Sequence, residues 1–446
     1  MPDRGRPTPK RNGNGHNGSN GHVLHRPKAP SPAAVKARFG RLFGKRFSRN
    51  NLELLAPVHS AVMALRRSAA TIRGRGANIF TQWVGDPDAL GSSLILRAIL
   101  TELGAKEVRI LTGILGHPQN RYLVERCGIA LHDPNTERLP RGLNCTVDTS
   151  PPLGMSNTGP VAPVKDFFFV ADHHADPDEV EQNCRHQGVR TVRHAFVGLP
   201  VGSTSAFMAA MAYSFGVHET LGPEGRAAAA LGIYTDTSAL LHGATALDFR
   251  MFEKLTRDEA TVDVLDELRD YRVPPEWYQY RSEAFLNAEV TGAVRVAPVG
   301  YVKDGFRDVI AEVASDLLRI EGTSIGIALA VTQMGTEVSV RADSRLLRHQ
   351  GERIVKVIDH LLEYAFPGVS GFRYDRRPPF RVEGGACVPH EAAQERKWHL
   401  AAARNDGGGA AERKAMLDHC RKIAQAIIAA LEDLKFARPD EIQGLL

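Results

Sequence analysis

Apolar runs of strand type alternate with helical segments along the middle of the chain. Residues 52–70, 92–105 and 121–130 carry apolar positions at helical spacing. The runs that predict strands are residues 78–85, 107–112, 144–148, 165–171 and 189–194. Strands that alternate with helices pair in parallel, so the pattern predicts an α/β fold with a doubly wound, mainly parallel sheet.

The pattern changes after residue 247. Residues 248–271 predict one charged helix that leads out of the first domain, and SIGIALAVTQ (324–333) and TEVSVRAD (336–343) predict antiparallel strands. We therefore expect a smaller C-terminal α+β domain. The expected segments are a tail at 1–50, the first domain at 51–247, a linker helix at 248–284, the second domain at 285–392 and a helical extension at 393–446.

The first 50 residues carry a net charge opposite in sign to that of the rest of the chain. The whole chain has a net charge of +5, but this tail holds twelve Lys or Arg against Asp3 alone, which is +11, so the remainder carries −6. Residues 1–33 have almost no large apolar side chains and predict disorder. Residues 33–47 predict a short amphipathic helix, docked either on a partner or on the protein's own body. The tail is either a nucleic-acid contact or a solubilising extension.

Composition narrows the class of protein. The 446 residues are 43% hydrophobic and 24% charged, which is typical of a globular protein with two domains. No apolar run approaches the ~20 residues that span a bilayer. The N-terminus has no apolar segment of the secretory type, and the five cysteines are scattered. We expect a cytoplasmic protein with reduced thiols.

Carboxylates follow several of the apolar runs. We call these positions stations. They are Asp86-Pro87-Asp88 after NIFTQWVG, Asp148 after LNCTV, Asp172-His173-His174 after FFFVA, and Asp236 after ALGIYT. Ligands bind in parallel α/β sheets at the carboxyl ends of the strands, where these stations would meet. Carboxylates with some imidazole are the ligand set of hard divalent cations. The stations therefore predict a metal site for phosphate-ester hydrolysis, although any single Asp there could simply cap a helix.

The order of these stations resembles that of the DHH phosphoesterase superfamily. The motifs are D-x-D-A-x-G-S, V-D-T, A-D-H-H and G-I-x-T-D-T, and the resemblance covers residues 78–250. It implies a DHH domain followed by a DHH-associated domain. It also implies hydrolysis that depends on Mn²⁺ or Mg²⁺, one or two ions per site, with a metal-bound hydroxide as the nucleophile.

The resemblance also assigns residue roles. Asp88, Asp148, His173 and Asp236 would hold one metal, and Asp86 with the bridging Asp148 would hold the other. The catalytic residues would be His174, facing the substrate phosphate, and Asp172, orienting His173. Ser203 and Thr204 match a cluster near the cleft, although an N-cap of the next helix explains them equally well. In the second domain, Arg341, Gly384 and Gly385 would contact substrate, although a solvated strand arginine is the alternative for Arg341.

Two departures from the family weaken the case for activity. Gln82 stands where the family has a histidine ligand of the second metal, and the Gly384-Gly385 element lacks its adjoining histidine. A neutral amide is a poorer ligand than imidazole, so the second metal should bind weakly or not at all.

Two functions remain open at this stage. The first is an exonuclease-like or oligoribonuclease-like phosphoesterase for short single-stranded oligonucleotides, linear dinucleotides or 3′,5′-bisphosphonucleosides. The alternative is a noncatalytic nucleotide- or nucleic-acid-binding protein with a degenerate DHH site. A homodimer is compatible with either function.

Overall fold

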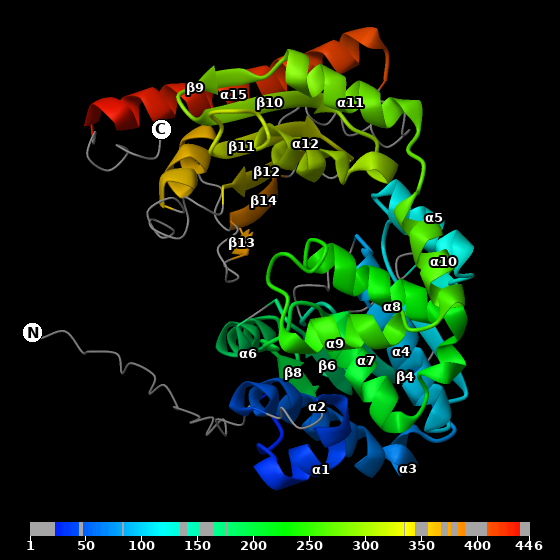
Figure 1. The fold of residues 1–446 in the computed structure, drawn as a ribbon. Helices are drawn as coiled ribbons and strands as arrows, with labels where there is room; N and C mark the ends of the chain where they lie inside the picture. Colours follow the sequence, from blue (N-terminus) through cyan, green and yellow to red (C-terminus); the bar gives the residue numbers. More distant parts are fainter. Residues whose placement is uncertain are drawn as a thin grey trace, which may run out of the picture.

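The computed structural model arranges the chain as two layered bodies joined along one side (Figure 1). The residues it describes are 23–43, 48–82, 84–133, 141–151, 164–174, 176–333, 335–343, 356–366, 373–375, 382–388 and 408–437. Within these ranges, every helix is too short or too polar to cross a lipid bilayer.

The first body is built on a six-stranded sheet in the order β3-β2-β1-β4-β6-β8. Its strands are β1 (Gly76–Phe80), β2 (Glu107–Leu111), β3 (Leu131–His132), β4 (Gly142–Val147), β6 (Phe169–Asp172) and β8 (Ala195–Val197). Every pairing is parallel, which confirms the predicted fold class. The strand order reverses at β1 and β4, and this switch point opens a crevice at their carboxyl ends. Strands β5 (Asp166–Phe167) and β7 (Thr191–Val192) form a small separate parallel pair.

Helices pack around this sheet, and all but one (α6, which contributes Val180 and Cys184 to a smaller core) share its main core. They are α2 (Arg49–Arg67), α3 (Ala69–Ile72), α4 (Pro87–Glu102), α5 (Pro118–Arg126), α6 (Pro177–His186), α7 (Thr204–Phe215), α8 (Gly222–Asp236), α9 (Ala246–Leu255) and α10 (Glu259–Arg269). Glycines let α4 and α8 approach closely. A Cβ on Gly91 would lie 2.8 Å from the Ala228 carbonyl oxygen, and one on Gly232 would lie 2.8 Å from the Asp88 Cα. This contact sets the distance between the two helices.

The second body is a mixed six-stranded sheet in the order β13-β14-β12-β11-β10-β9. Its strands are β9 (Glu289–Thr291), β10 (Val294–Tyr301), β11 (Ile325–Val331), β12 (Thr336–Ala342), β13 (Arg373–Asp375) and β14 (Val382–Val388). Strands β11 and β12 are antiparallel, as predicted, whereas β10 and β11 are parallel. Helix α15 (Ala410–Ala437) and a helix at 356–365 cover one face. Helices α11 (Pro275–Leu286) and α12 (Val309–Leu317) cover the other face.

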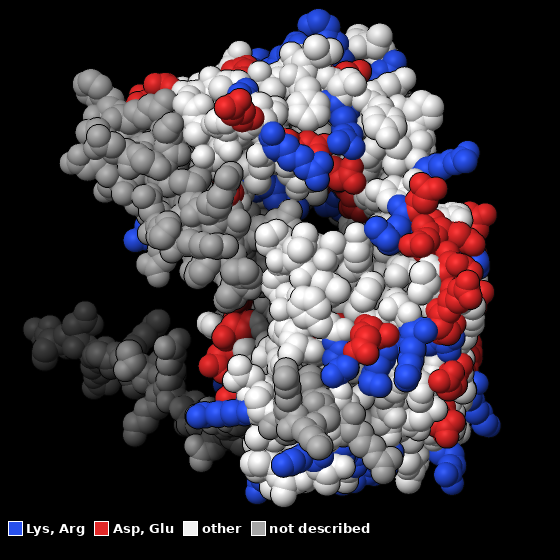
Figure 2. All heavy atoms as spheres, viewed as in Figure 1, with Lys and Arg blue, Asp and Glu red and all other residues white. Residues whose placement is uncertain are grey.

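Direct contacts fix the two bodies to each other beside the α10–α11 connection. His117 Nε2, at the start of α5, lies 2.8 Å from Glu312 Oε1 on α12. Arg121 donates to the Gly305 carbonyl oxygen and lies over the Phe306 ring. The two bodies therefore meet on one side of a hollow that is open in the space-filling view (Figure 2). We propose the predicted boundaries at 51–247, 248–284 and 285–392 as the domain division.

The N-terminal segment is attached to the first body from Val23 onward. Glu181 accepts hydrogen bonds from the N–H groups of Val23 (2.7 Å) and Leu24 (2.8 Å), and His25 N donates to the Val192 carbonyl oxygen at 2.9 Å. Helix α1 (Pro32–Phe43) then packs on α2. The predicted disorder was therefore wrong for residues 23–33. Residues 1–22, the rest of that segment, lie outside the described ranges.

Some predicted elements were wrong. Asp236 does not follow a strand: GIYTD belongs to the last turn of α8, because the apolar run that precedes it is rich in alanine, a strong helix former. The predicted strand at 78–85 ends at Phe80, and the helix predicted at 92–105 begins earlier, at Pro87. The single helix expected at 248–271 is divided into α9 and α10, because Asp258 caps a new helix by accepting from Thr261 N.

Gly232→Ala should push α8 away from α4, because the new Cβ would meet backbone atoms that cannot move aside. We expect a loss of roughly 1–3 kcal/mol in the free energy of unfolding, measured by urea denaturation. Gly40→Ala on α1 is the control, since its Cβ would have no neighbour closer than 3.9 Å. An equal effect of both substitutions would show that the α4–α8 approach is not set by Gly232.

Candidate metal centre

The predicted stations meet in the crevice at the carboxyl ends of β1 and β4. Asp86 is the N-cap of α4 and accepts a hydrogen bond from Ala89 N at 2.8 Å. Asp88 lies in the first turn of the same helix and is fully buried. Asp148 follows β4, and Asp236 ends α8, which the glycine contacts hold against α4. A helix end therefore takes the place that the sequence had assigned to a fourth strand.

The N-terminus of α7 anchors Asp88. Thr204 N donates to Asp88 Oδ2 and Ser205 N to Oδ1, both at 2.7 Å. The free N–H groups and the positive end of a helix dipole stabilise a carboxylate in this position. Ser203 caps the helix by accepting from Ala206 N. The serine-threonine cluster thus caps α7 and also contacts the acidic centre, which were the two alternatives left open by the sequence.

Asp148 has an unusual backbone and an unsatisfied carboxylate oxygen. Its φ is +58°, in the left-handed region that few residues other than glycine adopt. Oδ1 accepts from Thr204 Oγ1 at 3.0 Å, whereas Oδ2 is buried without a hydrogen-bond partner among the residues that the structure describes. A strained residue with a buried, unsatisfied carboxylate oxygen indicates a functional position that requires a further partner.

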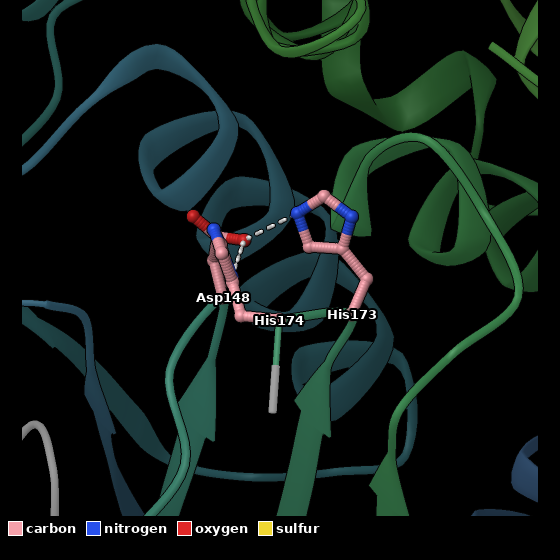
Figure 3. Close-up of side chains that lie close together, drawn as sticks. All are labelled: Asp148, His173 and His174. Carbon is pink, nitrogen blue, oxygen red and sulfur yellow. Dashed lines mark ion pairs between the residues drawn. The ribbon is translucent and has the colours of Figure 1, made fainter. Parts of the chain in front are cut away.

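His173 directs one ring nitrogen at three carboxylates, of which Figure 3 shows that of Asp148. Its Nε2 lies 2.9 Å from Asp236 Oδ2, 3.4 Å from Asp148 Oδ1 and 3.8 Å from Asp88 Oδ2. Its Nδ1 lies 3.3 Å from the Val201 carbonyl oxygen, which can only accept a hydrogen bond. Nδ1 therefore carries hydrogen, and Nε2 is the ring nitrogen left to bind a metal ion.

These separations fit the coordination shell of a divalent cation. Two ligand atoms bound about 2.1 Å from an octahedral ion and 90° apart lie about 3 Å from each other. Two groups of three side chains offer ligand atoms within 4.8 Å of one another: Asp88, His173 and Asp236, and Asp148, His173 and His174. Oxygen and imidazole nitrogen donors suit Mn²⁺ and Mg²⁺. The four residues expected for one metal are therefore together, with His174 beside them.

The carboxylates are electrostatically costly without a cation. Burial, followed by the charge of Asp236, raises the pKa of both Asp86 and Asp88, that of Asp86 to about 8. Burial and then the charge of Asp88 raise the pKa of Asp148 well above its usual range. Each shift reflects negative charge in a dry site, and a bound cation would remove the cause.

Asp172 orients His174, so the predicted partnership with His173 was wrong. Asp172 Oδ1 lies 2.9 Å from His174 Nδ1 and accepts from His174 N, while Oδ2 accepts from Ser150 Oγ at 2.6 Å. Burial acts to raise the pKa of Asp172, but these hydrogen bonds and the charge of His174 outweigh burial and lower it to about 2. The prediction failed because the two adjacent rings point in different directions. The His173 ring faces the Val201 carbonyl oxygen, and the His174 ring folds back over Asp172.

Asp86 lies outside both groups of ligands. Gln82 Nε2 donates to Asp86 Oδ2, and the N–H of Ala89 occupies Oδ1. The side-chain amide of Gln82 therefore already occupies one oxygen of this carboxylate. The geometry offers less for a second ion than the sequence motif suggested.

The predicted second-domain residues lie on neighbouring strands. Arg341 on β12 is half-buried and lies on the face covered by α12, since Val340 and Ala342 face the opposite core. Its Nη1 donates to Ser339 Oγ at 3.3 Å and to the Val340 carbonyl oxygen at 3.0 Å. In the register with β14, Gly384 pairs with Val340 and Gly385 with Ser339. Arg341 and the two glycines are thus adjacent, apart from the acidic centre.

One residue of the centre's support was missed at first. Asp248 is fully buried and accepts hydrogen bonds from Gly202 N (2.8 Å) and Ser203 Oγ (3.0 Å), so it braces the loop that presents Thr204. The signal was available in the sequence. Thr245 and Asp248 have the spacing of a capping box, and they form one at the start of α9.

Comparisons of sequence give little information about function. No family model matches the chain. An uncharacterized protein of Methanocaldococcus jannaschii is 24% identical over 278 residues, which are 60% of this chain and 52% of the relative. The chain thus spans about half the length of the curated relative it matches.

Comparisons of structure are more informative. An exopolyphosphatase-related protein from Bacteroides fragilis superposes with a TM-score of 0.50 at 13% identity, covering 82% of this chain and 97% of that structure. The chain shares the fold of that protein. RecJ from Thermus thermophilus, solved with Mg²⁺, gives a TM-score of 0.33 at 13% identity and covers 91% of this chain and 66% of that structure.

Asp148→Asn tests the electrostatics of the centre. Asn tolerates the left-handed backbone and removes one charge, so the variant without metal should melt at the same temperature as the wild type or higher at pH 7.5. It should lose the rise in melting temperature that Mn²⁺ gives the wild type. The control is Asp178→Asn on α6, whose carboxylate is exposed. A full Mn²⁺-induced rise in Asp148→Asn would rule out Asp148 as a ligand.

Proposed function

We propose that the protein is a metal-dependent phosphoesterase that hydrolyses phosphodiester or phosphomonoester bonds of small nucleotide substrates. The observation that carries the proposal is the convergence of His173 Nε2 with three carboxylates at the switch point of the sheet, of which those of Asp88 and Asp148 are fully buried. The order of the motifs, typical of the DHH superfamily, supports it, as does the fold shared with an exopolyphosphatase-related protein.

Asp88, Asp148, His173 and Asp236 would hold the ion, Mn²⁺ or Mg²⁺. When bound, a divalent cation lowers the pKa of water and stabilises negative charge on a phosphoryl group. The chain's own contribution is rigidity. Asp88 is fixed by two backbone N–H groups of α7, and Asp148 by Thr204 and by its own N–H, which donates to the Ala171 carbonyl oxygen at 2.8 Å. Such fixed ligands lose little entropy when the substrate arrives.

His174 is the group that would contact the phosphate. Its side chain is 36% exposed beside the buried cluster. The ionised Asp172 accepts a hydrogen bond from Nδ1, which leaves Nε2 as the ring nitrogen that faces a phosphoryl oxygen and, in a protonated ring, would donate to it. Charge that develops on that oxygen in the transition state would be stabilised by this hydrogen bond.

The second domain would bind the remote part of the substrate. Arg341 lies on the face of the mixed sheet that carries α12, and Gly384 and Gly385 on β14 allow a ligand to approach the backbone beside it. A guanidinium binds phosphate through two parallel hydrogen bonds. A ligand held at both ends would be a short molecule with two phosphate groups, such as a linear dinucleotide, a short oligonucleotide or a 3′,5′-bisphosphonucleoside.

The direct test is hydrolysis of bis(p-nitrophenyl) phosphate and of a dinucleotide with Mn²⁺, followed by addition of a chelator. We expect activity that the chelator abolishes. Asp88→Asn and Asp236→Asn should each lower kcat more than ~100-fold, because each removes a ligand, whereas Asp178→Asn should have no effect. Wild-type turnover in either ligand variant at saturating Mn²⁺ would contradict the assignment.

Arg341→Ala should separate binding of the remote phosphate from the chemical step. We expect kcat/KM for a 5′-phosphorylated dinucleotide to fall roughly 10- to 100-fold, the loss typical of one charged hydrogen bond, and bis(p-nitrophenyl) phosphate to be hydrolysed normally. Arg295→Ala is the matched strand control, since Arg295 on β10 bonds Thr323. Equal losses for both substrates would assign Arg341 a structural role.

One observation favours a second candidate, a nucleotide-binding protein that has lost turnover. Gln82 bonds Asp86 where the family has a histidine, so the chain is equipped for one ion more clearly than for two. Gln82→His should then raise the number of bound Mn²⁺ ions measured by isothermal titration and increase turnover. An unchanged stoichiometry and rate would show that Asp86 is a helix cap with no part in metal binding.

A further inference from the structure

A basic pocket lies on the first body, away from the metal centre. It has a volume of about 570 Å³ and lies between α1, α2 and the C-terminal end of α7. Its described lining includes Arg38, His59, Arg66 and Tyr213, and no carboxylate. Helix α7 has 12 residues and is therefore about 18 Å long, with the acidic centre at its N-terminal end and this pocket at the other end.

The positive charge extends beyond the pocket as a strip. We call the basic strip the side chains of Arg38, Arg66, Arg67 and Arg193 together with the imidazoles of His59 and His194. Burial, followed by the charge of Arg66, lowers the pKa of Arg38. Burial and then Arg38 and Arg67 lower the pKa of His59. Burial, Arg193, Arg67 and His25, in that order, lower the pKa of His194 to about 4. The four arginines therefore act on a common region.

These arginines are not neutralised within the described part of the chain. Arg38 donates to Met63 Sδ at 3.2 Å, Arg66 donates to the Ser214 carbonyl oxygen at 2.8 Å, and Arg193 lies over the Phe168 ring at 5.9 Å. None of the three forms an ion pair with a described carboxylate. By contrast, Arg49 at the start of α2 pairs with Glu53 at 3.3 Å. Along the lower edge of Figure 2, where α1 and α3 lie in Figure 1, Lys and Arg side chains (blue) are more prominent than Asp and Glu side chains (red).

We propose that the basic strip binds the phosphate backbone of a nucleic-acid strand. Uncompensated guanidinium groups gathered from neighbouring elements match a ligand with several negative charges better than a single anion. The pocket is also larger than one phosphate, and Tyr213 in its lining offers a ring to a base or sugar. The net charge of +11 on residues 1–50 adds attraction of the same sign.

Both imidazoles remain useful to such a ligand when neutral. The His59 Nδ1 is buried without a hydrogen-bond partner, and His194 Nε2 lies 3.0 Å from Ser68 Oγ at the end of α2. The negative end of the α7 dipole opposes an anion at this place, but Arg66 covers the last carbonyl groups. The strip therefore keeps its positive potential.

This inference does not depend on hydrolysis, so the test is done with the full chain in EDTA. Binding of a fluorescent 12-nucleotide oligothymidylate is followed by anisotropy between 50 and 200 mM NaCl. Arg38→Gln/Arg67→Gln removes two charges and spares Arg66, which bonds a helix carbonyl group. Arg49→Gln on α2 is the matched control.

The double variant should bind the oligonucleotide more weakly than the wild type. The factor by which its affinity falls between 50 and 200 mM NaCl should be roughly sevenfold smaller than the wild-type factor, as the loss of two phosphate contacts requires. The control should behave as the wild type, and all three proteins should melt at the same temperature. If the double variant melts earlier, Arg67→Gln alone should still reduce the salt dependence.

Wild-type affinity and salt dependence in both variants would overturn the proposal. Complete displacement of the oligonucleotide by millimolar inorganic phosphate at constant ionic strength would overturn it as well, because it would assign the pocket to a small anion.

Discussion

The mutual repulsion of buried carboxylates is the constraint on which the arrangement of the first domain depends. Asp86, Asp88, Asp148 and Asp236 share one crevice, and burial with neighbouring charge raises the pKa of the first three. Removing isolated charges from water costs several kcal/mol each. A sequence would keep such a cluster only if the surrounding structure compensates for it or if a cation does.

The fold supplies part of the compensation. The N-terminus of α7 donates two backbone N–H groups to Asp88, and the start of α4 donates one to Asp86. The close approach of α4 and α8 at Gly232 places Asp236 within reach of His173. Since these donors belong to helix ends and not to flexible side chains, the ligand atoms stay in place without metal. The remaining negative charge, at Asp148 Oδ2 above all, is left for a cation.

The sequence predicted the parallel sheet and which residues would meet, because strand ends in an α/β fold share one edge. It did not predict the helix that carries Asp236, since an apolar run of strand length does not distinguish a strand from a buried helix. It also paired Asp172 with the wrong histidine. Adjacent residues turn in opposite directions after a strand, and only coordinates show which one faces back. The capping-box spacing marks Asp248 in the sequence, but no local pattern encodes its contact to Gly202, 46 residues away.

Helix α7 separates two groups of like charge in the first domain. The acidic centre lies at one end of this helix, and the basic strip lies at the other. A nucleic-acid strand and a divalent cation would thus be attracted to different places on one rigid element. This separation prevents the basic residues from neutralising the carboxylates that the cation requires.

Anomalous diffraction from crystals grown with Mn²⁺ tests the central claim most directly. The account predicts a manganese peak within about 2.0–2.3 Å of His173 Nε2 and of carboxylate oxygens from Asp88, Asp148 and Asp236. The side chains should move little from their metal-free positions. A crevice without a manganese peak at millimolar Mn²⁺, with the carboxylates bonded to one another through shared protons, would contradict it.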